Sequence, residues 1–183
     1  MKISKKILIV ALTIIVVLPI AVFAQTESLA GEKAYAEGDY LKAIKLFSAA
    51  INDGDVTQEN WRFLGMSFVH LKKKGFAKKA FKRADKLKRR KSNDAFKHHK
   101  VTGRIYVRPT RESERNRVQG EIRMAIEFLK DGSVGVVYPY KKLPYGLTEK
   151  VVEAIRKVEF EPAMRDGKKI TTVGTLSYRF SIN

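Results

Sequence analysis

The side chains best suited to chemistry in this chain are its three histidines and two closely spaced glutamates. His98 and His99 are adjacent within a basic stretch, and His70 stands alone inside a helical pattern. Adjacent histidines without a carboxylate at ligand spacing lack the pattern of a zinc site. Glu159 and Glu161 alternate like exposed carboxylates, with no evident buried partner that would make either one a general acid or base. We therefore predict no catalytic group, no metal site and no bound cofactor.

The rest of the composition also argues against an enzyme. The 183 residues include no cysteine, so neither a disulfide nor a thiolate site can form. The sequence contains no Gly-x-Ser-x-Gly motif and no phosphate-binding loop. We expect a non-enzymatic protein of one or two small domains.

The N-terminal segment has the pattern of an export signal. Three lysines precede a mostly apolar run, which is followed by Pro19 and a small-residue end at Ala24. This order predicts a secretory signal peptide over residues 1–24, cleaved after Ala24. A second interpretation stays open, because residues 7–24 are long and apolar enough for an uncleaved helix anchored in the inner membrane. Either form would place the remaining chain on the far side of the membrane from the cytoplasm.

The chain is strongly basic, and its charge is unevenly distributed. The formal net charge is +18, and residues 72–100 carry fourteen Lys or Arg against two Asp, a net charge of +12. The polyanions within reach of an exported protein are lipid headgroups and acidic wall polymers rather than nucleic acid. The segment is therefore either a contact surface for an anionic membrane or wall, or a solvated helix face followed by a charged linker.

A helical repeat occupies residues 27–91. Gly31 and Gly65 lie 34 residues apart, and the residues that follow them match in kind, with Ala43 facing Ala77 and Phe47 facing Phe81 in the alignment. This period is typical of tetratricopeptide (TPR) repeats, in which small residues let two helices approach and large rings fill the gaps between them. Two repeats are fewer than the three usually needed for an independent array. The predicted repeat core is Gly31, Tyr35, Ala43, Phe47, Trp61, Gly65, Ala77 and Phe81.

The next segment, residues 92–117, is rich in charge and poor in apolar periodicity. We expect it to be a basic linker, with a short strand at residues 104–107.

The last segment, residues 118–183, alternates as strands and one helix would. Apolar and polar residues alternate up to Phe128, Asp131-Gly132 supplies a turn, and a return strand follows. Thr148 is expected to cap the next helix, and residues 171–180 alternate again as a closing strand. The predicted fold class is α+β, with two TPR-like helical hairpins followed by an antiparallel three-stranded sheet packed on a helix.

The order of these last segments resembles the C-terminal domain of TonB proteins. The resemblance is carried by GEIRMAIEFLKDGSVGVVYPY, GLTEKVVEAIRKVEFEPAMRDGKKI and TTVGTLSYRFSIN. It implies an adaptor or energy transducer in the periplasm of a Gram-negative-type envelope that binds the N-terminal box of a TonB-dependent outer-membrane transporter by strand addition. It also implies a docking edge in the closing strand, at Thr171, Val173, Thr175, Ser177 and Arg179.

Two departures from that family affect the energy-transducing role. The linker contains one proline, Pro109, where the best-known TonB proteins have a proline-rich stretch, and residues 1–30 lack the histidine those proteins use for motor coupling. Two functions follow as hypotheses. The first is a TonB-like transducer, partnered by inner-membrane motor proteins if residues 7–24 remain uncleaved. The second is a periplasmic TPR scaffold that mediates protein contacts without transmitting force.

Overall fold

The computed structural model describes residues 25–89, 91 and 95–181. The predicted signal peptide or anchor, residues 1–24, lies outside the described residues. Among the residues that are described, no helix is long and apolar enough to cross a membrane. The chain divides into two compact units, Met1–Lys88 and Arg89–Asn183, which we call the helical unit and the C-terminal unit.

The helical unit consists of antiparallel helical hairpins. Residues 25–36 are helical, followed by α2 (Tyr40–Asn52), α3 (Gln58–His70) and α4 (Lys74–Ala84). Side-chain oxygens begin two of these helices: Asp39 accepts the Lys42 N–H at 3.0 Å, and Thr57 accepts the Asn60 N–H at 3.2 Å. Each bond satisfies a donor that the first turn of a helix leaves without a partner.

The same close contact occurs in both hairpins, one period apart. A Cβ placed on Gly31 would lie 3.0 Å from the Phe47 ring, and one on Gly65 would lie 2.7 Å from the Phe81 ring. The rings therefore occupy the space that a side chain at either glycine would need. Seven of the eight predicted core residues are buried, namely Gly31, Tyr35, Ala43, Phe47, Gly65, Ala77 and Phe81, whereas Trp61 is half-buried.

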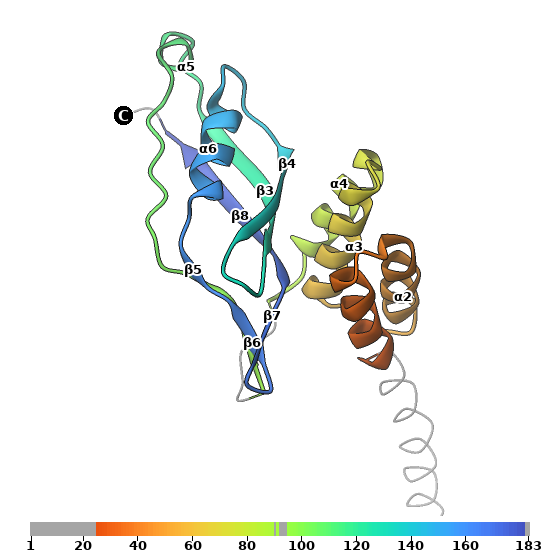
Figure 1. Ribbon diagram of the computed structural model, residues 1–183. Coiled ribbons are helices and arrows are strands. Elements are labelled where there is room, and N and C mark those ends of the chain that lie inside the picture. The colour runs from red at the N-terminus through yellow and green to blue at the C-terminus, as the bar shows by residue number, and fades with distance from the viewer. Residues whose placement is uncertain (1–24, 90, 92–94, 182–183) are drawn as a thin grey trace, which may run out of the picture. The chain divides into compact units, whose positions relative to one another are not determined.

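The C-terminal unit is built on a three-stranded antiparallel sheet. Its strands are β3 (Gly120–Phe128), β4 (Val134–Lys141) and β8 (Thr172–Phe180), in the order β4-β3-β8. Helix α6 (Leu147–Arg156) crosses one face of this sheet (Figure 1). The alternation seen in the sequence places apolar side chains of β3 under the helix, where they pack in a core that includes Ile122, Met124, Ile126, Leu147, Val151 and Ile155. The predicted α+β fold class and its sheet-on-helix domain are confirmed.

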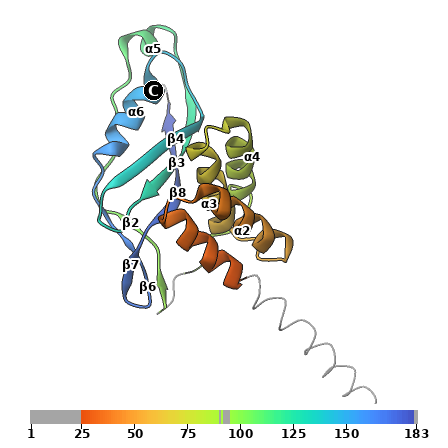
Figure 2. The same cartoon turned by 45° about the vertical axis from the view of Figure 1, so that its right-hand side comes forward.

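Five short strands and one short helix complete the described part of the C-terminal unit. Strand β1 (Phe96–Lys97) pairs with β6 (Ala163–Arg165), which pairs with β7 (Lys168–Ile170); strand β2 (Lys100–Val101) pairs with β5 (Phe160–Glu161). Strands β6 and β7 extend beyond the end of the three-stranded sheet (Figures 1 and 2). Helix α5 (Arg111–Arg115) precedes β3.

These short elements change the interpretation of residues 92–117. The described part of this stretch pairs with strands near residue 160 and lies in the C-terminal unit, so it does not act as a free linker. Residues 104–107, expected as a strand, have no regular secondary structure, although Val107 is buried in the core. Thr148 does not cap α6; its hydroxyl bonds the backbone of Leu143 instead, and the cap position is occupied by Gly146.

Candidate peptide-docking edge

Strand β8 lies at one edge of the β4-β3-β8 sheet. It pairs with β3 along its full length, with Met124 opposite Leu176 and Ile122 opposite Tyr178. Among the described residues, no strand pairs with its other side. An edge strand of this kind offers backbone donors and acceptors to a further strand.

The register identifies which backbone groups of β8 point toward the open edge. Leu129 donates its N–H to the Ser133 carbonyl at 3.0 Å, so its backbone groups point toward β4. Successive residues of a strand point their backbone groups to opposite edges, so the even-numbered residues of β3 bond β8. Ile122 and Met124 are therefore bonded to Tyr178 and Leu176. The odd-numbered residues of β8, from 173 to 179, point their N–H and C=O groups outward.

The five predicted docking residues occupy different environments along this edge. Thr171 lies one position before β8, and its hydroxyl accepts the Lys130 N–H at 3.3 Å. Val173 is buried, Thr175 is half-buried, and Ser177 and Arg179 are exposed. The C-terminal half of β8 is thus the part whose side chains are open to solvent.

A network of hydrogen bonds to the Glu121 carboxylate, which the sequence did not reveal, connects this half of β8 to the other strands. Glu121 on β3 accepts from the Ser177 hydroxyl, from Arg123 at 2.8 Å and from Lys141 on β4 at 3.2 Å. The Ser177 hydroxyl, together with Arg123 and Lys141, lowers the pKa of Glu121 to about 2. All three strands are therefore connected through one ionised side chain on the face opposite α6.

Another missed element covers the helix-facing side of β8. The Val107 N–H donates to the Tyr178 hydroxyl at 3.0 Å. His99 stacks on Phe128 with 3.9 Å between ring centroids, and its Nδ1 lies 3.0 Å from the Thr172 hydroxyl oxygen. The histidine ring also lies 2.8 Å from where a Cβ on Gly174 would be, so only glycine leaves room for it. His99, which the sequence placed in a linker, is a packing residue of the sheet.

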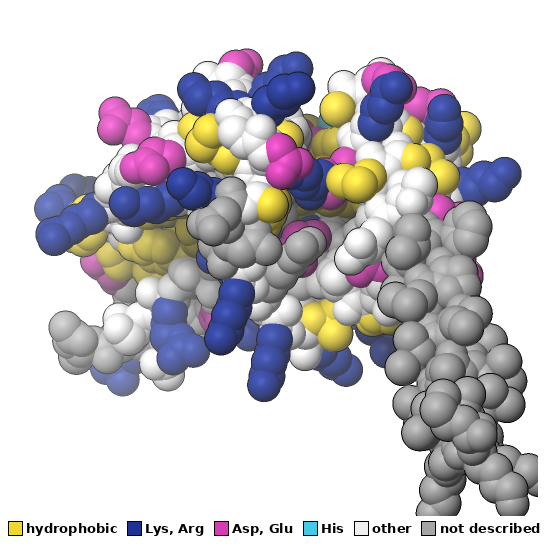
Figure 3. Space-filling view, turned by 90° about the horizontal axis from the view of Figure 1, so that it is seen from below, with side chains coloured by type: hydrophobic (Ala, Val, Ile, Leu, Met, Phe, Trp, Pro, Cys, Tyr) yellow, Lys and Arg dark blue, Asp and Glu magenta, His cyan; other side chains and the backbone are white. Residues whose placement is uncertain are grey.

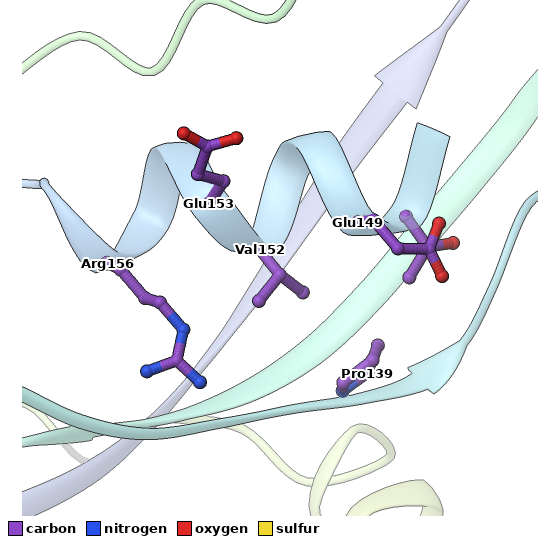
Figure 4. A pocket seen from close by; sticks show the side chains of 6 residues that line it. Pro139, Glu149, Val152, Glu153 and Arg156 are labelled. Atoms are coloured by element: carbon purple, nitrogen blue, oxygen red, sulfur yellow. The ribbon is translucent and has the colours of Figure 1, made fainter. Parts of the chain in front are cut away.

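A shallow groove of about 350 Å³ lies at the opposite edge of the sheet, between α6 and β4. Val152 and Arg156 project from α6 toward the strand that carries Pro139, whereas Glu153 points away (Figure 4). This groove is separate from the β8 edge. Within the described residues, no group of three or more His, Cys, Asp or Glu side chains could hold a metal ion.

The C-terminal part of the chain is similar to known proteins. Residues 110–182 match the family model of the Gram-negative bacterial TonB protein C-terminal domain. The solution NMR structure of the Pseudomonas aeruginosa TonB C-terminal domain is similar at 19% identity and a TM-score of 0.36, covering 50% of this chain and 90% of that chain. No curated protein matches. The similarity to the TonB C-terminal domain family is therefore limited to residues 110–182, and the helical unit lies outside the match.

Proposed function

We propose that this chain is a TonB-like adaptor of the Gram-negative envelope. Its C-terminal unit binds the N-terminal box of a TonB-dependent outer-membrane transporter as an added strand beside β8. Residues 110–182 match the model of the TonB C-terminal domain family, whose members are non-enzymatic transport adaptors that generally interact with such receptors. The observation that carries the proposal for this chain is the edge position of β8, with the backbone groups of its odd-numbered residues directed outward.

Strand addition accounts for how such an edge would work. The affinity comes from backbone hydrogen bonds, and the alternate side chains of the peptide supply specificity. Ser177 and Arg179 are exposed, so an incoming strand can reach the backbone beside them without displacing core side chains. The Glu121 network holds this part of β8 to β3 and β4, so the edge is ordered before a peptide arrives.

A proline substitution tests this docking edge. Arg179→Pro removes one outward N–H, and proline is tolerated at an edge position that donates no bond within the sheet. Arg179→Ala is the matched control, because it removes the same side chain and keeps the N–H. We expect a receptor-box peptide to bind the alanine variant nearly as well as the unaltered protein and the proline variant about tenfold more weakly, as for the loss of one backbone hydrogen bond. Equal binding by both variants would place the peptide elsewhere.

The helical unit favours a second candidate function, a periplasmic TPR scaffold that recruits proteins without transmitting force. Its two hairpins stand where the best-known TonB proteins have a proline-rich spacer. Mass spectrometry of the protein from envelope fractions separates the candidates. A start at Gln25 in the soluble periplasm would favour the scaffold or a force-free adaptor. An intact Met1 in the inner membrane would favour a transducer coupled to motor proteins.

A further inference from the structure

Helix α4 carries a basic face that its packing does not require. Its buried residues are Ala77, Ala80, Phe81 and Ala84, which recur at helical spacing and face the other helices of the unit. The exposed basic residues of the same helix, Lys78, Lys79, Lys82 and Arg83, fall on the opposite side. One side of α4 therefore holds the hairpin together, and the other presents positive charge to solvent.

The charge of the helical unit is concentrated on this helix and its flanks. Residues 72–89 carry ten Lys or Arg and one Asp, a net charge of +9, whereas residues 25–71 carry four Lys or Arg and seven Asp or Glu, a net charge of −3. Three of the lysines, Lys72 to Lys74, stand at the N-terminal end of α4, where the helix dipole disfavours positive charge. The helix dipole therefore does not account for the position of these three lysines.

An exposed aromatic ring lies beside the basic face. Phe76, in the first turn of α4, is 59% exposed, although its ring lies 5.3 Å from that of Phe68 between centroids. The apolar face of α4 is buried in the helical unit, so Phe76 is the apolar group beside the basic face that could enter the boundary between headgroups and acyl chains.

The type of the basic residues also favours a lipid surface. Eight of the ten basic residues in 72–89 are lysines. Lysine is a hydrated point charge suited to a diffuse layer of headgroups, whereas arginine is preferred where discrete phosphates are bound by paired hydrogen bonds. A site that binds one discrete phosphate through paired hydrogen bonds would favour arginine instead.

We propose that the basic face of α4, together with Phe76, binds the surface of an anionic phospholipid membrane. Figure 3 shows exposed Lys and Arg side chains on one face of the molecule, and the basic residues of α4 are each exposed to solvent. Lipid contact through α4 and peptide docking at β8 use different units of the chain, so either can fail without the other.

A local probe tests the site in the full chain. Because the sequence has no cysteine, a nitroxide can be attached to a single introduced cysteine. Phe76→Cys places it at the proposed contact, and Leu41→Cys, at a residue 69% exposed on α2, is the matched control. With vesicles containing phosphatidylglycerol we expect the label at position 76 to gain oxygen accessibility, as in lipid, and the label at position 41 to remain in water. Identical behaviour at the two positions would overturn the proposal.

Charge variants then measure the electrostatic contribution. Lys78→Gln/Lys82→Gln removes two charges from the α4 face, and Lys42→Gln/Lys45→Gln removes two exposed charges from α2. Loss of one lysine near an anionic surface weakens binding about fivefold, so the α4 pair should weaken it roughly 25-fold and the α2 pair only slightly. The readout is the ratio of binding to phosphatidylglycerol vesicles and binding to phosphatidylcholine vesicles. The apolar residues 7–24 are the same in all variants, so their contribution to binding does not differ between them. Equal losses for both pairs, or tighter binding to duplex DNA or wall glycan than to the anionic vesicles, would contradict a membrane site.

Discussion

The helical unit and the C-terminal unit differ in how far apart in sequence their contacting residues lie. In the helical unit, each ring packs against a glycine of its own hairpin, Phe47 on Gly31 and Phe81 on Gly65. In the C-terminal unit, the backbone of Val107 bonds a hydroxyl 71 residues away. A hairpin can form once its own residues are present, whereas the sheet requires both ends of its unit. We therefore expect a substitution in the helical unit to destabilise that unit alone. A substitution in the C-terminal unit should destabilise the whole of its sheet.

Removing a ring from the helical unit should give the largest effect and leave the C-terminal unit intact. Phe81→Ala deletes a fully buried side chain and should cost about 3–5 kcal/mol of the unfolding free energy of the helical unit. Phe76→Ala, on the same helix but 59% exposed, is the control and should cost less than about 1 kcal/mol. Amide hydrogen exchange, followed separately in the two units, measures the destabilisation by each variant. Equal loss of protection in the C-terminal sheet would show that the two units do not unfold independently.

A substitution in the supposed linker should destabilise the whole C-terminal unit. His99→Ala removes the stack on Phe128 and the bond to Thr172, and should cost about 1–2 kcal/mol. The control is Lys100→Ala, which removes only an exposed ion pair with Glu161 and should cost less than about 1 kcal/mol. The denaturant midpoint of the C-terminal unit provides the comparison. If the His99 variant is as stable as the Lys100 variant, His99 does not stabilise the sheet, and residues 92–117 would be better described as a linker.

The smallest expected effect is a pH dependence of the unfolding free energy of the C-terminal unit. Glu121 has a folded-state pKa of about 2 against its ordinary 4.5, so the unfolded chain binds its proton more readily. Its contribution to stability is complete above about pH 4.5 and is lost as the pH falls toward 2. Glu121→Gln removes this dependence. The unfolding free energy plotted against pH should therefore fall more steeply between pH 5 and pH 2.5 for the unaltered protein than for the variant. Parallel curves would show that the network does not stabilise the sheet.

The parts of the fold that sequence predicts are those with a local repeating signal. The 34-residue spacing of Gly31 and Gly65 predicts their buried positions because each packs against a ring of its own hairpin. The alternation up to Phe128 and the Asp131-Gly132 turn predict the β3-β4 hairpin for the same reason. The closing strand is likewise visible as an alternation, although its place at the sheet edge depended on the family resemblance.

The missed parts depend on partners that are distant in sequence. Strands β1 and β2 are two residues long, too short for a period of two to be recognised. His99 is a sheet residue only because Gly174, 75 positions later, leaves room for its ring. Glu121 bonds Ser177 only once the register of β3 with β8 is fixed, and no local pattern determines that register.

Backbone amide exchange can show, residue by residue, whether an extended peptide binds at the edge of β8. The amides of Ser177 and Arg179 point outward, whereas the amide of Tyr178 between them is bonded to β3. We expect a receptor-box peptide to slow exchange at residues 177 and 179 and to leave residue 178 almost unchanged. Uniform slowing along β8, or no change at residues 177 and 179 with a bound peptide, would contradict strand addition at this edge.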